Sequence, residues 1–133
     1  MRAVVDTNIF VSGLLRPDGP PGAVVLAIAE RRLTPVVCQA AMVEYGEVLR
    51  RRAFRFAAAD VDALLAVTAE LAIWVEVPAY TGAPDLPDPA DWPFLACALA
   101  AQCPVITGNV KHFPGRLGVV VMTAREWVDQ AHA

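Results

Sequence analysis

Short apolar runs alternate with helix-forming segments along this chain, and this pattern restricts its fold more than any other feature. β-Branched and other apolar residues form these runs, which favours strands. None of the runs has a polar face, which indicates burial on both sides. Such strands, separated by helices, predict an α/β fold with a parallel sheet that is covered on both faces. We expect the strands at residues 3–5, 34–38, 73–77, 104–107 and 119–122.

Apolar residues at helical spacing occupy the intervals between the expected strands. Thr123 is expected to cap the last helix, because Glu126 three residues later completes a capping box. Asp60 is expected to cap an earlier helix. Residues 16–22, with three prolines and two glycines, and residues 78–93 are expected to form loops. The helices are expected at residues 9–15, 23–32, 40–52, 60–71, 94–102 and from 123 onward.

Composition limits the class of protein. The chain has 133 residues, of which 56% are hydrophobic and 19% charged, which fits a single folded domain over residues 1–133. A net charge of −3 disfavours nucleic-acid binding by a uniformly basic surface, but it allows a basic rim around an acidic centre. No apolar run approaches about 18 residues, so we expect no membrane span. Asp6 follows the first residue too closely for a signal peptide, and we expect a cytoplasmic protein.

Several kinds of site are disfavoured by the motifs that the sequence lacks. It has no GxGxxG, GxxxxGK[ST], HExxH or GxSxG motif. His112 and His132 are too few for a histidine-rich zinc site. Cys38, Cys97 and Cys103 lack CxxC spacing and are expected to be buried apolar residues rather than a redox or metal site. Carboxylates remain, and their hard oxygen atoms suit Mg²⁺ or Mn²⁺.

Acidic and polar residues follow the expected first and fourth strands. Open α/β sheets bind ligands beyond the carboxyl ends of their strands, which makes these positions candidates for a site. Asp6, directly after the first strand, is either a helix N-cap or a metal ligand. Thr107 and Asn109 follow the fourth strand. Asn109 is either a left-handed turn residue or a neutral oxygen ligand.

Further acids lie on or beside the expected helices. Glu44 lies on the flank of an apolar stripe and is expected to reach inward. Glu47 lies nearly opposite that stripe and is expected to be a surface charge. Asp91 is expected to cap the helix that follows it, which leaves an oxygen atom free for a cation. Asp88 is either a turn residue or a second acid at the rim of the site.

Four segments place an acid or an amide among apolar residues: VVDTNIFVSGLL (4–15), VEYGEVLRR (43–51), DPADWPFLACALA (88–100) and VITGNVKHF (105–113). In their order and spacing they resemble the motifs of PIN-domain ribonucleases. The resemblance is closest to the toxins of toxin–antitoxin pairs and covers essentially the whole chain. It implies a three-layer α/β/α sandwich with a five-stranded parallel sheet. Many relatives have Asp where Asn109 stands, and often an acid where Trp92 stands, so this chain departs from the pattern at both positions.

The resemblance implies a metal-dependent endoribonuclease that cleaves RNA phosphodiester bonds with Mg²⁺ or Mn²⁺. It carries the metal-ligand positions onto Asp6, Glu44, Asp91 and Asn109. Glu44 is a ligand or a water-orienting base, and Asn109 and Thr107 are expected to hold metal-bound water. The same pocket is expected to include Thr7, Asn8, Ser12 and Asp88. Candidate contacts to the RNA backbone are Arg16, Arg50, Arg51, Arg52, Arg55, Lys111 and Arg116, although Arg50, Arg51 and Arg52 equally suit a solvated helix end.

Two other functions stay open at this point. A PIN-like module could bind RNA or protein without cleaving it, because Asn109 departs from the family pattern. A phospho-receiver domain is disfavoured, since it needs a second acid where Asn8 stands and a lysine after the fifth strand, and the only lysine is Lys111. The resemblance also implies an antitoxin partner. The high apolar content of so small a domain leads us to expect a homodimer.

Overall fold

Five short strands pair in parallel to form one sheet, in the order β3-β2-β1-β4-β5. The computed structural model describes residues 1–132. Parallel pairing places Val4 of β1 beside Val105 of β4 and Arg2 of β1 beside Thr34 of β2. The parallel sheet predicted from the sequence is therefore confirmed. The strands are β1 (Arg2–Val5), β2 (Thr34–Val37), β3 (Ile73–Trp74), β4 (Val105–Ile106) and β5 (Val121–Met122).

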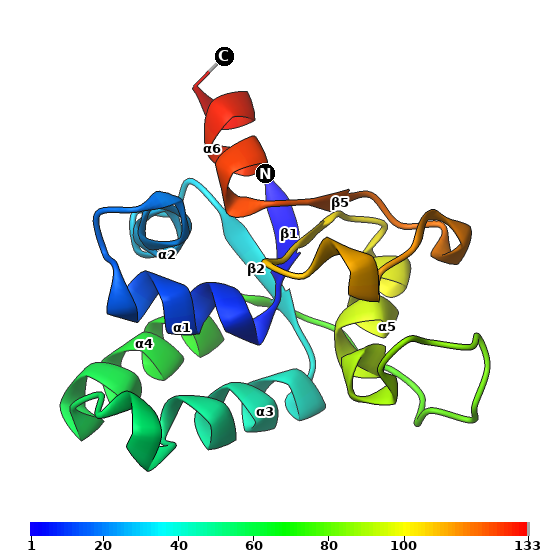
Figure 1. The fold of residues 1–133 in the computed structure, drawn as a ribbon, viewed down its shortest axis with the longest axis horizontal. Coiled ribbons are helices and arrows are strands. Elements are labelled where there is room, and N and C mark those ends of the chain that lie inside the picture. The colour runs from blue at the N-terminus through cyan, green and yellow to red at the C-terminus, as the bar shows by residue number, and fades with distance from the viewer. Residues whose placement is uncertain (133) are drawn as a thin grey trace.

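Helices cover both faces of this sheet, which makes the fold the expected three-layer α/β/α sandwich (Figure 1). α1 and α2 lie on one side of the strands, and α5 packs on the other side against β1, β2 and β4. α3 runs beneath the carboxyl ends of the strands, in contact with α1, α4 and α5 (Figure 1). The helices are α1 (Thr7–Leu15), α2 (Pro20–Ala29), α3 (Gln39–Leu49), α4 (Ala58–Leu71), α5 (Trp92–Ala101) and α6 (Ala124–Ala131).

Single turns of 3-10 helix shape the loops at the sheet edge. Most of them adjoin the segments that resemble the family motifs. They place polar side chains next to the strand ends, which matters for the site described below. They are η1 (Arg52–Phe54), η2 (Pro89–Asp91), η3 (Val110–His112) and η4 (Gly115–Leu117).

Aromatic packing fixes the ends of β1 and α3 relative to each other. Tyr45 of α3 is fully buried, and its hydroxyl donates a hydrogen bond to the carbonyl of Val5. The ring of Phe10 packs edge-on against Tyr45 with centroids 4.7 Å apart, a favourable aromatic geometry. The contacts tie α1, α3 and the end of β1 together. These contacts hold the chain in place where it leaves β1 at Asp6.

Several of the expected boundaries are wrong, among them the starts of α2 and α4. Residues 16–22 were expected to be a loop, but α2 begins at Pro20. Proline is tolerated at the start of a helix, where its missing N–H would have no partner. Asp60 does not cap α4, which begins at Ala58. Asp60 lies in the first helical turn instead, where a negative charge favours the helix dipole.

Two other expectations on local structure are confirmed, and the one for the third strand is not. Thr123 and Glu126 form the reciprocal capping box at the start of α6. All three cysteines are free and buried. The third strand departs from the prediction in length and in burial, because β3 covers only Ile73 and Trp74 and both side chains are exposed. β2 gives way to α3 at Cys38, which leaves residues 76–77 without a strand to pair with. Among residues 1–132, no helix combines the length and the apolar character needed to span a bilayer.

Candidate active site

The carboxyl ends of β1 and β4 form the base of an acidic cleft. β1 has β2 on one side and β4 on the other, so the connections leave it in opposite directions. Such a switch point opens a crevice at the carboxyl end of a parallel sheet. Asp6 directly follows β1, and Thr107 directly follows β4. The pairing of the two strands therefore brings residues about a hundred positions apart into contact.

Asp6 is the most buried acid of the cleft, with 5% of its surface exposed. Its extended backbone makes it the N-cap of α1, and its Oδ1 accepts a 2.7 Å hydrogen bond from the amide of Thr7. Its Oδ2 accepts a 2.7 Å hydrogen bond from the hydroxyl of Thr107. The capping alternative is thus correct for Asp6, and it leaves lone pairs on both oxygen atoms for a cation.

Asn8 links the start of α1 to the segment after β4. Its Oδ1 accepts a hydrogen bond of 2.9 Å from the amide of Gly108. Its Nδ2 lies 3.3 Å from Oδ2 of Asp6 and 3.4 Å from the hydroxyl oxygen of Thr107. Asn8 therefore holds the two strand ends in register and orients the carboxylate between them.

Glu44 enters the cleft from α3. It is half-buried, and its Oε2 accepts a hydrogen bond from the hydroxyl of Thr7. Glu47, three residues later on the same helix, is exposed. The inward and outward orientations are those that the apolar stripe indicated.

Asp91 lies where η2 runs into α5, and 8% of its surface is exposed. The expectation that its side chain caps α5 is wrong, because the backbone at Asp91 is already helical and the side chain makes no capping hydrogen bond. Asp88 takes the capping role one turn earlier, where its Oδ1 accepts from the amide of Ala90 at 3.0 Å. The carboxylate of Asp91 is therefore free to face the cleft.

His112 is a site residue that the sequence reasoning missed. Its Nδ1 lies 2.7 Å from Oδ2 of Asp91, and its Nε2 lies 2.9 Å from Nδ2 of Asn109. A proton on Nδ1 would let the imidazole donate to Asp91 and accept from Asn109. The signal in the sequence is that His112 follows Asn109 by three residues, which brings the two side chains together in a short helix such as η3. Considering the two histidines only as zinc ligands does not reveal this role, because here the imidazole contacts a carboxylate and an amide.

Asn109 does not adopt the left-handed turn conformation that was one of its alternatives, since its φ is −131°. Its backbone amide donates to the Thr107 hydroxyl at 3.0 Å. On the other side of His112, ligand atoms of Asp88, Asp91 and His112 all lie within 4.8 Å of one another. Oxygen atoms with one imidazole nitrogen form a donor set that suits a divalent cation.

Burial raises the pKa of all three inward-facing acids. The pKa of Asp6 is raised by its burial, although the hydrogen bonds from Thr107 and Thr7 oppose this effect. Burial also raises the pKa of Glu44, and nearby Asp6 adds to the effect. The pKa of Asp91 rises to about 6, first through burial and then through the charge of Asp6. Burial disfavours the ionised form of these carboxylates, and a bound divalent cation would offset that cost by favouring their charged form.

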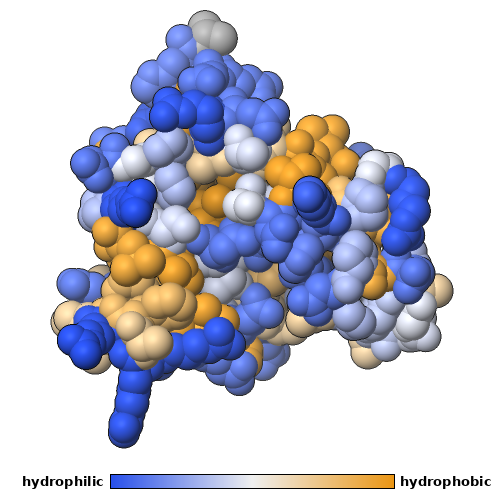
Figure 2. Space-filling view, viewed as in Figure 1, coloured by the Kyte–Doolittle hydropathy of each residue, from blue (hydrophilic) through white to orange (hydrophobic). Residues whose placement is uncertain are grey.

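The cleft has a volume of about 430 Å³ and brings together most of the expected pocket residues. Thr107 lies beneath it, fully buried. Figure 2 shows the molecule from the same side as Figure 1, with hydrophilic residues across the centre and apolar residues over α1. The expected residues that line the cleft are Asp6, Thr7, Asn8, Ser12, Glu44, Arg51, Asp88, Asp91 and Asn109.

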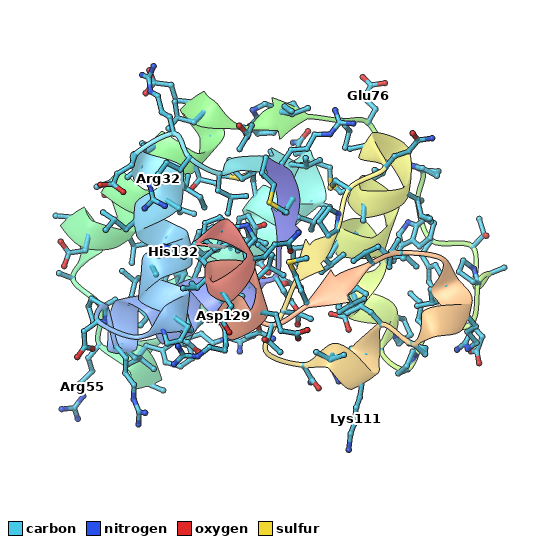
Figure 3. All side chains as sticks on the ribbon, turned by 90° about the horizontal axis from the view of Figure 1, so that it is seen from above. Arg32, Arg55, Glu76, Lys111, Asp129 and His132 are labelled. Carbon is cyan, nitrogen blue, oxygen red and sulfur yellow. The ribbon has the colours of Figure 1, made fainter. Side chains whose placement is uncertain are left out.

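The other basic residues expected at the rim do not line this cleft. Arg16 lines an adjoining hollow that shares Ser12 with it. Arg50 is exposed and forms an ion pair of 2.6 Å with Asp62. Lys111 extends outward into solvent (Figure 3), and Arg116 is exposed on η4.

The fold and the site define a parallel α/β domain with clustered carboxylates at the switch point of its sheet. A family model described as the PIN domain matches residues 2–111. The chain belongs to the PIN domain family, whose members are generally nucleases and typically use divalent metals. A search among curated proteins gave no match for the chain.

Proposed function

We propose that this protein is a metal-dependent endoribonuclease that cleaves RNA phosphodiester bonds. One observation carries the proposal: Asp6, Glu44 and Asp91 come from three distant segments and face one cleft with raised pKa values. Mg²⁺ or Mn²⁺ is the proposed cofactor, because carboxylate oxygens prefer such hard cations.

Asp6 and Asp91 are the proposed principal ligands, and Glu44 acts as a ligand or as the base that orients water. When bound, the cation supplies an activated water molecule and neutralises charge on the phosphoryl oxygens. Thr107 is better described as a positioning residue, because it is fully buried and its hydroxyl donates to Asp6. Its hydroxyl also accepts from the amide of Asn109.

His112 is proposed to position Asp91, whose Oδ2 it contacts at 2.7 Å. The Asp88, Asp91 and His112 group would also suit a second cation that shares Asp91 with the first. Asn109 contacts this imidazole rather than a carboxylate. We therefore propose that it acts through His112 as well as lining the cleft.

The direct test incubates the purified protein with a fluorescent single-stranded RNA in Mn²⁺ or Mg²⁺. We expect cleavage that stops on addition of EDTA and is absent in Asp6→Asn. RNA binding without cleavage in either metal would instead support the alternative function, a non-catalytic PIN-like module that binds RNA or protein. Cleavage that persists in EDTA would contradict metal dependence.

We further propose that the protein is the cytoplasmic toxin of a toxin–antitoxin pair. Its three free cysteines suit a reducing compartment. The acidic cleft suits an inhibitory partner segment whose Arg or Lys contacts Asp6, since guanidinium groups bind carboxylates in two-point geometry. Exposed Leu15, at 55%, offers an apolar contact nearby.

The product of an adjacent reading frame would be purified and tested for binding to this protein by calorimetry. Affinity is expected to fall as Mn²⁺ rises and to fall in Asp6→Asn. Equal binding to wild type and Asp6→Asn, without metal dependence, would mean that inhibition acts away from the acids.

A homodimer is proposed as the state in solution. Large apolar side chains that are exposed support this proposal, such as Leu26 at 54% and Trp74 at 51%. Two-fold dimers are the commonest oligomers of soluble proteins. Light scattering at micromolar concentration tests this, and a monomer would contradict it.

A further inference from the structure

One wall of the cleft changes character along α3 and the turn that follows it. Glu44 and Val48 are four residues apart on α3, so they share one face. Both line the cleft, together with Arg51, which follows the end of the helix. Phe54 of η1 continues the same wall. Along this wall the acid beside the proposed metal ion is therefore followed by an apolar, a basic and an aromatic side chain, which are Glu44, Val48, Arg51 and Phe54.

Phe54 lies outside the hydrophobic core. Its ring stacks on that of Phe56, with centroids 5.5 Å apart and planes 15° from parallel. Phe56 is partly buried against the core, so it anchors the pair. Arg55 between them has a left-handed backbone with φ of 57°, which is uncommon for a residue other than glycine. Phe54 and Phe56 flank this turn, and their rings stack across it.

Basic side chains surround this aromatic pair. Arg51, Arg52 and Arg55 are exposed, and within residues 1–132 none of them forms an ion pair. Figure 3 shows Arg55 extending outward into solvent. By contrast, neighbouring Arg50 is paired with Asp62. Unpaired arginines beside an aromatic ring match the two components of single-stranded nucleic-acid sites.

We infer that residues 51–56 bind the unpaired RNA strand next to the cleavage site. Phe54 stacks on a flanking base, and Arg51 contacts a flanking phosphate. The inference rests on the proposed nuclease function and adds a binding site for a flanking unpaired nucleotide, with little preference for its base. Every base has a face that can stack on Phe54, whereas bases inside a duplex are already stacked on one another.

The test measures stacking and affinity in a background that binds RNA without cleaving it. Asp91→Asn protein with Mn²⁺ is titrated into a single-stranded RNA that carries 2-aminopurine, whose fluorescence falls on stacking. The same RNA annealed to its complement provides the duplex arm. Variants Phe54→Leu and Phe54→Trp are compared in this background. Trp74→Leu is the matched control, since Trp74 is an exposed aromatic residue at β3, outside the cleft.

Phe54→Leu is expected to weaken single-strand binding about tenfold and to abolish the fluorescence decrease, with duplex binding unchanged. Phe54→Trp is expected to keep both signals, as is Trp74→Leu. Equal losses on single strand and duplex, or no loss on either, would overturn the inference. A Phe54→Leu protein that keeps RNA binding but loses a protein partner would assign the surface to that partner and also overturn it.

Failure of the proposed function has a different signature. If wild-type protein with Mn²⁺ neither binds nor cleaves any RNA, the nuclease proposal fails and the inference fails with it. If wild-type protein cleaves RNA while Phe54→Leu in the Asp91→Asn background binds normally, only the inference fails. Thermal melting of each variant separates a local effect from misfolding.

Discussion

Two hollows lie along the carboxyl edge of the same sheet, and of the two only the smaller one is lined by several carboxylates. The hollow beside β2 and β3 measures about 850 Å³, roughly twice the acidic cleft at about 430 Å³. Its only acid is Glu76, which is exposed. The acidic cleft contains Asp6 and Asp91, both buried. Volume therefore identifies a depression in the surface, whereas buried and converging carboxylates identify a candidate site.

The difference follows from the positions of the strands in the sheet. β1 lies in the middle, so segments after β4 and before α5 both approach its carboxyl end. β3 is one of the two edge strands and pairs only with β2. Polar groups consequently converge at β1, while β3 ends in the exposed side chain of Trp74. Paired substitutions in the two hollows test this contrast.

The largest effect is expected for Asp91→Asn, set against Glu76→Gln in the other hollow. Loss of one carboxylate charge at nearly constant volume should lower RNA cleavage by about 100-fold or more, while Glu76→Gln leaves it unchanged. Cleavage assays with Mn²⁺ measure this, and circular dichroism melting shows whether the fold survives. Full activity in Asp91→Asn would remove Asp91 from the site.

The pH dependence of cation binding should reflect the raised pKa of Asp91. Because its pKa is about 6 in the fold and 3.8 ordinarily, Mn²⁺ affinity should fall by up to tenfold per unit as the pH drops below about 6. Calorimetry across pH 5–8 measures this. An affinity that stays constant over this range would contradict the assignment.

The same shift predicts the opposite trend for stability without metal. The folded state binds the Asp91 proton more tightly than the unfolded state, so protonation as pH falls through about 6 should raise the melting temperature in EDTA. This stabilisation should disappear as pH rises through 6. Asp91→Asn should lack this part of the pH dependence, while Glu76→Gln should retain it.

A smaller effect is expected for His112→Gln, which removes the imidazole beside Asp91. Loss of an orienting group next to a ligand typically weakens metal binding 10- to 100-fold, and we expect the lower end for Mn²⁺. Lys111→Gln is the matched control, since this neighbouring side chain points into solvent. Equal Mn²⁺ affinities in both variants would show that His112 plays no part in the metal centre.

The smallest effect is expected for Asn109→Asp, which adds a negative charge at the rim. Mn²⁺ affinity should rise several-fold, because the added charge lies beside the His112 imidazole and near the acids. Glu47→Gln, on the exposed face of α3, should leave affinity unchanged. Unchanged or weaker affinity in Asn109→Asp would mean that Asn109 acts only through the position of His112.

Local patterns in the sequence were enough to predict the sheet, its parallel pairing and several of the acids that meet there. The apolar runs correctly predict burial on both faces for β1, β2 and β4, because a strand without a polar face has no side suited to solvent. β3 is the exception, since both of its residues are exposed at the edge of the sheet. The inward direction of Glu44 follows in the same way from helical spacing. Asp6 was identified because it directly follows the first such run, and the switch-point rule applies to any strand end in this fold.

The tertiary structure alone decided which side chains meet. The contact between Asp91 and His112 joins residues 21 positions apart, and it depends on how η3 docks against the start of α5. The turn at Asp88, rather than Asp91, takes the capping bond, since the backbone enters α5 already helical. Arg55 likewise adopts a left-handed conformation that no sequence pattern signals. Periodicity records which face of an element is buried, whereas contacts between elements depend on the register and the loop geometry that packing selects.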